Sequence, residues 1–396
     1  MVAGEAAAAS PVAPPLAPAL FAMTSLQALV ALALFAPGVL APKLGIGEGA
    51  VSLFSTCVFV IGVTTSLAGG VLAARLGALA VAALCAVAVA AAMATAMQGS
   101  TAALVAAGIL LGLAFGPETP ASSALLARLS RPNQRPLIFS IRQTGNQIGA
   151  MLGSLTLPAI ALVAPQAGFA VIVLLACLVC TVLLAMRRRY DAAEVRTPAV
   201  AMELLRSWRL LRSSPGLSAL ALASMPYSAM QLALNAYFVI LAVDRLGLAH
   251  VTAGVLLAVA QGGGLIGRLL WGMVATRYVA ARSVIAGLGL AMTACAIAVA
   301  AASPDWPLAL LGTTAFVFGL TASGWNGVFL AEVARLAPDG RIPEATGAVL
   351  TASYAGLLLG PLLIAGVSQV ASLAHGYALL ATLSLLATVA LVRSQS

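Results

Sequence analysis

The sequence has little charge, few histidines and few clustered acids. Of its 396 residues, 8% are charged and 62% are hydrophobic, whereas a globular protein carries about 25% charged residues. This deficit excludes a soluble enzyme, because too few charged side chains are present to cover a water-exposed surface. A membrane enzyme would need a cluster of His, Asp, Glu or Cys near one interface, and two histidines with scattered acids do not supply one. We therefore expect that the protein is not an enzyme and that it has no cofactor and no metal site.

Cysteine is also scarce. The five cysteines all fall inside apolar stretches and their number is odd, which excludes a secreted disulfide scaffold. Cys177 and Cys180 have CxxC spacing, but no histidine or second cysteine pair lies near them. Buried, reduced thiols are the expected state.

Long apolar runs are what the chain does contain. Its mean hydropathy is +1.08, and a membrane-spanning helix needs about 20 apolar residues. An outer-membrane barrel would instead show alternating segments of about ten residues. The runs predict an all-α polytopic membrane protein with twelve transmembrane helices. The predicted spans are 19–41, 50–73, 78–97, 102–127, 137–163, 168–187, 217–243, 251–275, 282–302, 307–334, 345–370 and 375–392.

The basic residues are distributed unevenly between the connections. The even-numbered connections and the C-terminal tail hold 16 of the 20 lysines and arginines, whereas the odd-numbered connections hold only Lys43 and Arg245. Because arginine-rich loops stay in the cytoplasm, both termini are predicted to be cytoplasmic. Topology thus explains the pI near 10.0, and no nucleic-acid partner is expected.

The longest connection divides the chain into two halves. We expect a disordered tail over 1–18, a six-helix bundle over 19–187, a cytoplasmic linker over 188–216 and a second bundle with a short tail over 217–396. The linker is predicted to contain an amphipathic helix, because one helical face gathers four apolar residues and arginines occupy another. The apolar residues are Val200, Leu204, Trp208 and Leu211.

The two halves repeat each other. Residues 43–46 (KLGI) match residues 245–248 (RLGL) at an offset of 202, and the same offset relates Gly70 to Gly272. Each half has six spans and starts on the cytoplasmic side, so the halves form two bundles related by a pseudo-twofold axis along the membrane normal. Secondary transporters with this arrangement bind substrate between the halves near the bilayer midplane.

The segment after the second span resembles a signature of the major facilitator superfamily. That signature reads Gly-x-x-x-Asp-Arg-x-Gly-Arg, and residues 70–77 read GVLAARLG, with Ala74 at the acidic position. The second half repeats the signature at residues 272–277, with Thr276 at the acidic position. The resemblance covers residues 19–392 and implies the family's two-bundle fold and gradient-driven transport; the chain has no ATP-binding Walker loop. It also implies a cytoplasmic gate that contains Arg75, Arg277, Glu332 and Arg335, in which Glu332 pairs with Arg277. Because Ala74 and Thr276 replace the acidic residues of the signature, the ion pairs that usually hold this gate closed are expected to be weaker.

Three charged residues are predicted to lie deep inside spans, where a charge is costly. Arg268 lies nine residues from Arg277, or about 13 Å along a helix, which places it near the midplane. The run 267–272 (GRLLWG) resembles the eighth span of the monocarboxylate and oxalate carriers, in which an arginine grips the substrate carboxylate. A helix-packing role for Arg268, bonded to neighbouring carbonyls, is the alternative.

Glu118 and Arg142 are the other two buried charges. The fourth and fifth spans are expected to be antiparallel neighbours, so the two side chains can form an ion pair. Either this pair only neutralises itself, or Glu118 is the proton-coupling acid and Arg142 its partner, because Glu118 is the only acid near the midplane.

Polar side chains at mid-depth are candidates for the wall of a substrate cavity, with hydrogen bonding between helices as the alternative. Three of them recur every four residues along the seventh span, and the others lie in the fifth, tenth and eleventh spans. These candidates are Tyr227, Gln231, Asn235, Asn146, Gln147, Asn326 and Tyr354.

The preferred hypothesis is a monomeric secondary transporter of a small organic carboxylate in a bacterial inner membrane, working by alternating access. The sequence leaves undecided whether transport is coupled to protons. The alternative is a proton-driven multidrug exporter of the same superfamily. The exporter signature Gly-x-x-x-Gly-Pro-x-x-Gly-Gly is reduced in the fifth span to Gly145, Gly149 and Gly153 without proline, which favours the carboxylate carrier.

Overall fold

The computed structural model describes residues 14–191 and 209–394, and the regular structure in these ranges is helical. Two short 3-10 helices, Ala41–Leu44 and Pro132–Gln134, occur in connections. The α-helices are α1 (Leu16–Leu40), α2 (Glu48–Leu76), α3 (Ala78–Ala96), α4 (Thr101–Leu129), α5 (Arg135–Val163), α6 (Pro165–Tyr190), α8 (Pro215–Asp244), α9 (His250–Arg277), α10 (Ala281–Ala301), α11 (Leu308–Ala322), α12 (Asn326–Leu336), α13 (Ile342–Val370) and α14 (Leu373–Arg393).

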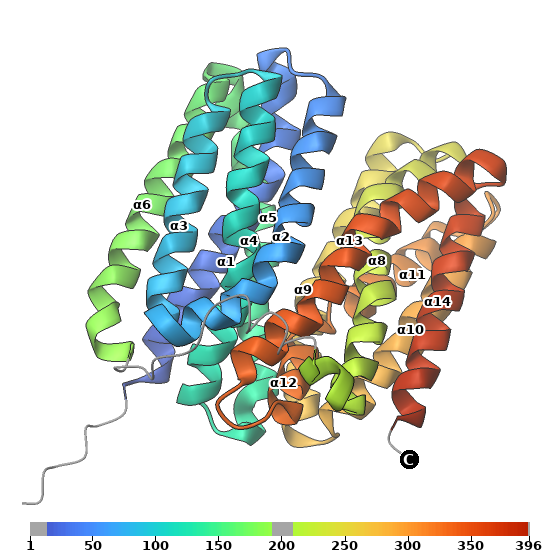
Figure 1. The fold of residues 1–396 in the computed structure, drawn as a ribbon. Helices are drawn as coiled ribbons and strands as arrows, with labels where there is room; N and C mark the ends of the chain where they lie inside the picture. Colours follow the sequence, from blue (N-terminus) through green and yellow to red (C-terminus); the bar gives the residue numbers. More distant parts are fainter. Residues whose placement is uncertain (1–13, 192–208, 395–396) are drawn as a thin grey trace, which may run out of the picture.

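Twelve membrane spans are present among the described residues, as the apolar runs predicted. Helices α1–α6 form one bundle and α8–α14 the other (Figure 1). The bundles meet at the end of the molecule where the chain's described C-terminal end lies and stand apart at the opposite end. The fold is therefore the predicted pair of six-span bundles.

Most helices extend a few residues beyond the predicted spans. Helix α1 starts at Leu16, inside the predicted tail, and α6 continues to Tyr190. Apolar runs mark only the hydrocarbon-embedded part, and a helix continues into the interface until a cap or a glycine ends it. The predicted amphipathic linker helix lies mostly outside the described residues; residues 209–213 are helical. The domain limits stay predictions.

The internal repeat is visible in the backbone. Gly45 and Gly247, the matched glycines of the two halves, have φ of 72° and 68°. This left-handed conformation suits glycine because it has no Cβ. Each glycine turns the chain between the first and second spans of its bundle, so the matched motifs make matched turns.

The tenth span is predicted from the sequence as one continuous segment over 307–334, and the structure differs from this prediction. It is broken at residues 323–325, between α11 and α12. Trp325 is 1% exposed and packs edge-on against Tyr227 and Phe329, with ring centroids 5.6 and 4.9 Å away. Ser323, Gly324, Asn326 and Gly327 lie at this break, but glycines and polar residues also occur inside helices that stay continuous, such as Gly262 and Gly263 in α9. Hydropathy alone therefore did not predict the break.

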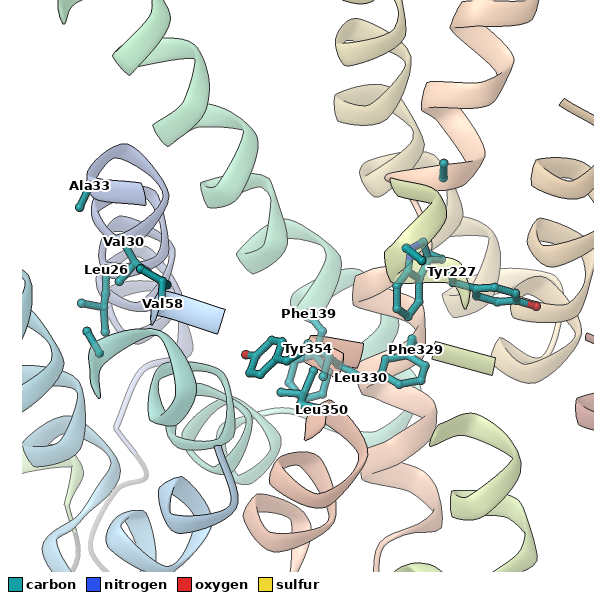
Figure 2. Close-up of a cluster of buried hydrophobic side chains, with 14 of the residues drawn as sticks. Leu26, Val30, Ala33, Val58, Phe139, Tyr227, Phe329, Leu330, Leu350 and Tyr354 are labelled. Carbon is teal, nitrogen blue, oxygen red and sulfur yellow. The ribbon is translucent and has the colours of Figure 1, made fainter. Parts of the chain in front are cut away.

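The two bundles pack closely at the end that carries the arginine-rich connections. Ser66 donates to the carbonyl of Gly347 at 2.9 Å, joining α2 to α13. On the other side, α5 packs on α9 and α12, and a Cβ on Gly272 would meet Ser140. Figure 2 shows Phe139 of α5 in one apolar group with residues of α12 and α13. This end of the molecule is closed by small residues and apolar packing.

Candidate functional site

A cavity lies between the bundles beyond this closed end. Side chains of α1, α2, α4, α5, α8, α9, α12 and α13 line it, and the lining continues along α1 as far as Phe35. The space open to the centres of water molecules is about 130 Å³, which suits a small molecule. Seven of the residues predicted from sequence line this cavity: Glu118, Asn146, Gln231, Asn235, Arg268, Asn326 and Tyr354.

Arg268 is buried, with 1% of its surface exposed, and it is one of the residues that line the cavity. Its Nη1 donates to the backbone carbonyl of Gln143 at 2.9 Å, across the bundle interface. Its Nε and Nη2 have no hydrogen-bond partner within the described ranges. These two nitrogens carry parallel N–H groups on one edge of the guanidinium, which is the edge that binds a carboxylate with two hydrogen bonds.

The break in the tenth span lies beside Arg268. A Cβ on Gly324 would come within 3.1 Å of the carbonyl carbon of Gly267, so the two backbones are in direct contact. Asn326, the first residue of α12, lines the cavity. The C-terminus of α11 and the N-terminus of α12 meet at this break, beside the guanidinium-bearing helix α9.

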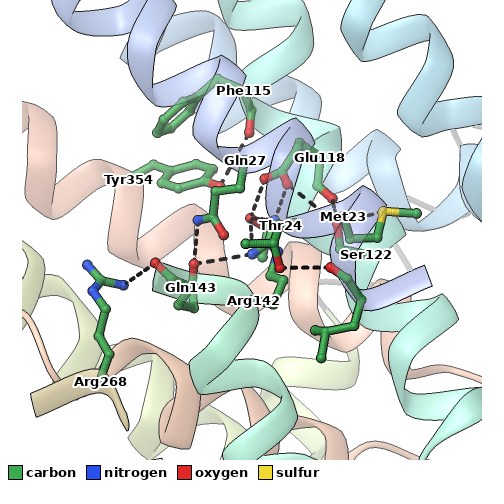
Figure 3. Close-up of polar contacts among 12 residues, drawn as sticks. Met23, Thr24, Gln27, Phe115, Glu118, Ser122, Arg142, Gln143, Arg268 and Tyr354 are labelled. Atoms are coloured by element: carbon green, nitrogen blue, oxygen red, sulfur yellow. Dashed lines mark hydrogen bonds and ion pairs between the residues drawn. The ribbon is translucent and has the colours of Figure 1, made fainter. Parts of the chain in front are cut away.

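The predicted ion pair between Glu118 and Arg142 is formed (Figure 3). Arg142 is 1% exposed and Glu118 is 3% exposed. Arg142 also donates to Thr119 Oγ1 at 3.2 Å and to Gln143 Oε1 at 3.3 Å. Gln27 of α1 donates to the same Gln143 oxygen. Glu118 faces the cavity while Arg142 stands behind it.

A chain of amide side chains joins α5, α9 and α8 next to the cavity. Gln147 of α5 donates to Gln261 of α9 at 2.7 Å, and Gln261 donates to Asn235 of α8 at 2.7 Å. Asn326 donates to Gln231 at 3.1 Å. The amides therefore link the bundles and present polar groups to the cavity.

Two residues predicted for the cavity wall lie elsewhere. Tyr227 is 0% exposed and its hydroxyl lies 2.6 Å from Thr388 Oγ1, inside the second bundle. Gln147 is used at the bundle contact and is not among the lining residues. Tyr227 shares a helical stripe with Gln231 and Asn235, but it lies one turn closer to the closed end, where the neighbouring helix α14 covers it.

Sequence reasoning missed several lining residues. Gln143 and Thr119 each adjoin a predicted buried charge, and Ser353 adjoins Tyr354. Their positions next to charged or aromatic candidates were a usable signal, because adjacent polar residues in an apolar span are rare. Phe59 and Phe115 carried no such signal, since an aromatic residue in a span is ordinary.

The expected pair between Glu332 and Arg277 is not formed. In the described chain both Glu332 oxygens accept from Arg335, at 2.7 and 2.8 Å. Arg335 lies one turn along the same helix, whereas Arg277 ends α9 at the surface, as Arg75 does near the end of α2. Thr276 contributes to closure instead: its Oγ1 accepts from the backbone N–H of Leu137 at 3.1 Å. That N–H is in the first turn of α5, where no intrahelical acceptor exists.

Comparison with known proteins gives a consistent result. The family model described as Major Facilitator Superfamily matches residues 16–361. The human organic anion transporter MFSD10 (TETRAN) has a similar structure, with TM-score 0.78, 18% identity and coverage of 96% of this chain and 100% of the other. The E. coli fucose:proton symporter FucP gives TM-score 0.77, 14% identity and coverage of 95% and 98%.

A third similar structure is a bacterial homologue of the iron transporter ferroportin in an outward-facing state. It has TM-score 0.74, 16% identity and coverage of 96% of this chain and 99% of the other. A search of curated protein sequences found no match.

Proposed function

Because the chain belongs to the Major Facilitator Superfamily, a family of membrane transporters, we propose that it moves a small organic carboxylate across the membrane by alternating access. The substrate binds in the cavity between the bundles, and Arg268 holds its carboxylate. The similar structures are described as carriers of an organic anion, a sugar and iron. At such low identity they share the fold alone, so the choice of cargo rests on the cavity.

The state of Arg268 carries the proposal. A buried guanidinium with two donors unpaired is costly, and the two donors occupy the edge that a carboxylate fits. The bond from Nη1 to the carbonyl of Gln143 fixes the plane of the guanidinium. An anion bound at the free edge would complete the hydrogen bonding of Arg268.

The arginine-rich end faces the cytoplasm, so the cavity is open to the outside in this conformation. Substrate enters from that side, the outer ends of the bundles close over it, and the contacts around Ser66, Ser140 and Thr276 then separate. A bacterial inner membrane is the location that fits this arrangement.

Glu118 is the proton-coupling group in this proposal. It lines the cavity and lies in an ion pair with Arg142. Protonation of Glu118 would break the pair and free Arg142. We expect Glu118→Gln to lose uptake driven by a proton gradient while keeping exchange of labelled for unlabelled substrate. Loss of both would assign Glu118 to substrate binding or folding instead.

Arg268→Lys tests the substrate class. The lysine keeps the positive charge but lacks the planar pair of donors, so affinity for a carboxylate should fall at least tenfold, or about 1.4 kcal/mol. Arg245→Lys is the matched control, because Arg245 lies outside the cavity and donates to the backbone carbonyl of Ala300. Binding is measured by calorimetry on purified protein at matched thermal stability. Unchanged affinity, or preference for a cation, would reject the carboxylate and favour the drug-exporter alternative.

A further inference from the structure

The cavity has two chemically different sides. Arg268 lies where α9 packs on α5, next to the amides of Gln143 and Asn146. On the other side, α2, α4 and α13 pack together and contribute Phe59, Phe115 and the ring of Tyr354. Figure 3 shows Phe115 above Gln27 and Tyr354 beside Gln27, with Arg268 at the lower left next to Gln143.

The three rings form one continuous surface. The Phe59 and Phe115 centroids are 5.7 Å apart in an edge-to-face contact, and those of Phe115 and Tyr354 are 4.9 Å apart. Leu350 and Leu357 of α13 extend the apolar surface along the same side. We call Phe59, Phe115 and Tyr354 the aromatic wall.

The charge of the cavity is as informative as its shape. Glu118 and Arg268 are the formally charged side chains among the lining residues of the described chain. Arg142, directly behind the lining, neutralises Glu118. The site therefore carries one uncompensated positive charge, which a single carboxylate balances. A second carboxylate would have to enter the apolar side without a partner, and burying an unpaired charge is strongly unfavourable.

We propose that the substrate is an amphiphilic monocarboxylate whose carboxylate binds Arg268 and whose aromatic or branched apolar tail packs on the aromatic wall. The inference rests on the proposed function, since it uses Arg268 as the carboxylate anchor. It adds two properties: the number of negative charges, one, and an apolar tail.

Four small probes separate these properties. Acetate has the carboxylate without the tail, phenylacetate has both, phenylmalonate adds a second carboxylate, and phenethylamine replaces the anion by a cation. Binding of each is measured by calorimetry, or by competition with labelled phenylacetate, at one pH and salt concentration. Phenylacetate should bind at least tenfold more tightly than each of the other three, about 1.4 kcal/mol.

Variants of the aromatic wall locate the tail. Phe59→Ala and Phe115→Ala should each weaken phenylacetate about three- to tenfold and leave acetate unaffected. Phe21→Ala is the matched control, because Phe21 is on α1, 74% exposed and not part of the cavity. Phe115→Leu keeps an apolar side chain of similar length but has no ring, so it reports on the wall if the alanine variant does not fold.

The outcomes distinguish the two proposals. Equal binding of acetate and phenylacetate, tighter binding of phenylmalonate, or no effect of the wall variants would overturn the amphiphilic monocarboxylate, while the dependence on Arg268 could still hold. Preference for phenethylamine, or failure of every carboxylate to bind, would overturn the proposed function itself.

Discussion

The two bundles each bury one arginine beside the cavity, and they treat it differently. Arg142 in the first bundle and Arg268 in the second are both 1% exposed. Arg142 has a carboxylate, a hydroxyl and an amide oxygen as partners. Arg268 has one backbone carbonyl as a partner, and two of its nitrogens have none among residues 14–191 and 209–394. The pseudo-symmetry thus repeats the helices but not the charges: one bundle neutralises its own buried cation, and among the described residues the other bundle supplies no counter-ion to Arg268.

Breaking the pair in the first bundle should have the largest effect on stability. Glu118→Leu leaves Arg142 buried without its counter-ion, and loss of one partner of a buried pair costs about 3–5 kcal/mol. We expect a large drop in the melting temperature of the detergent-solubilised protein.

The double variant Glu118→Leu, Arg142→Leu should recover most of that loss, because neither charge of the pair remains buried. If the single variant melts like the unmodified protein, Arg142 is solvated from the cavity and the contrast with Arg268 disappears.

Removing the arginine of the second bundle should change stability in the opposite direction. Arg268→Leu deletes two unsatisfied donors, each of which costs about 1–3 kcal/mol when buried, so the melting temperature should rise without ligand. Carboxylate binding should be lost, and addition of substrate should no longer stabilise the protein. A lower melting temperature would mean that Arg268 serves the fold, as its alternative packing role requires.

The bundles also differ at the closed end, where Thr276 of the second accepts from Leu137 of the first. Thr276→Val keeps the shape but removes the acceptor, and a lost helix cap costs about 0.5–2 kcal/mol. We expect the closed end to open more often, so that a cysteine introduced at Ala73, which is 2% exposed, reacts faster with a thiol reagent. Thr276→Ser keeps the hydroxyl and should react at the original rate.

Glu332 should matter least for this closure. Its partner Arg335 is on the same helix and has a side chain that is 60% exposed, and pairs with an exposed partner contribute about 0–1 kcal/mol. Glu332→Gln should therefore leave the reactivity of the Ala73→Cys probe nearly unchanged. Reactivity as high as in Thr276→Val would restore Glu332 to the gate, through a contact absent from this conformation.

Much of the site could be predicted because charge is expensive in lipid. Glu118, Arg142 and Arg268 were identified from their depth in apolar runs, and adjacent antiparallel spans were enough to pair the first two. The sequence could not show that Tyr227 lies outside the cavity. The polar stripe runs along the whole face of the seventh span, whereas the cavity borders only part of that face. The side chain of Gln143 could have been found from its position beside Arg142. Its backbone carbonyl, which accepts from Arg268, could not, because every residue has a carbonyl and no sequence pattern marks which one is used.

The sequence by itself determined the class of protein, the twelve spans, the repeat and the three buried charges. The class, the spans and the buried charges depend on local transfer free energies, which accumulate along the chain segment by segment. The repeat follows from matching residues at a fixed offset. Only the tertiary structure decided which donors of Arg268 stay unpaired, where the tenth span breaks and which residue Glu332 contacts. These features depend on how helices far apart in the sequence pack and rotate against one another, and hydrogen bonds form or fail over differences of a few tenths of an ångström.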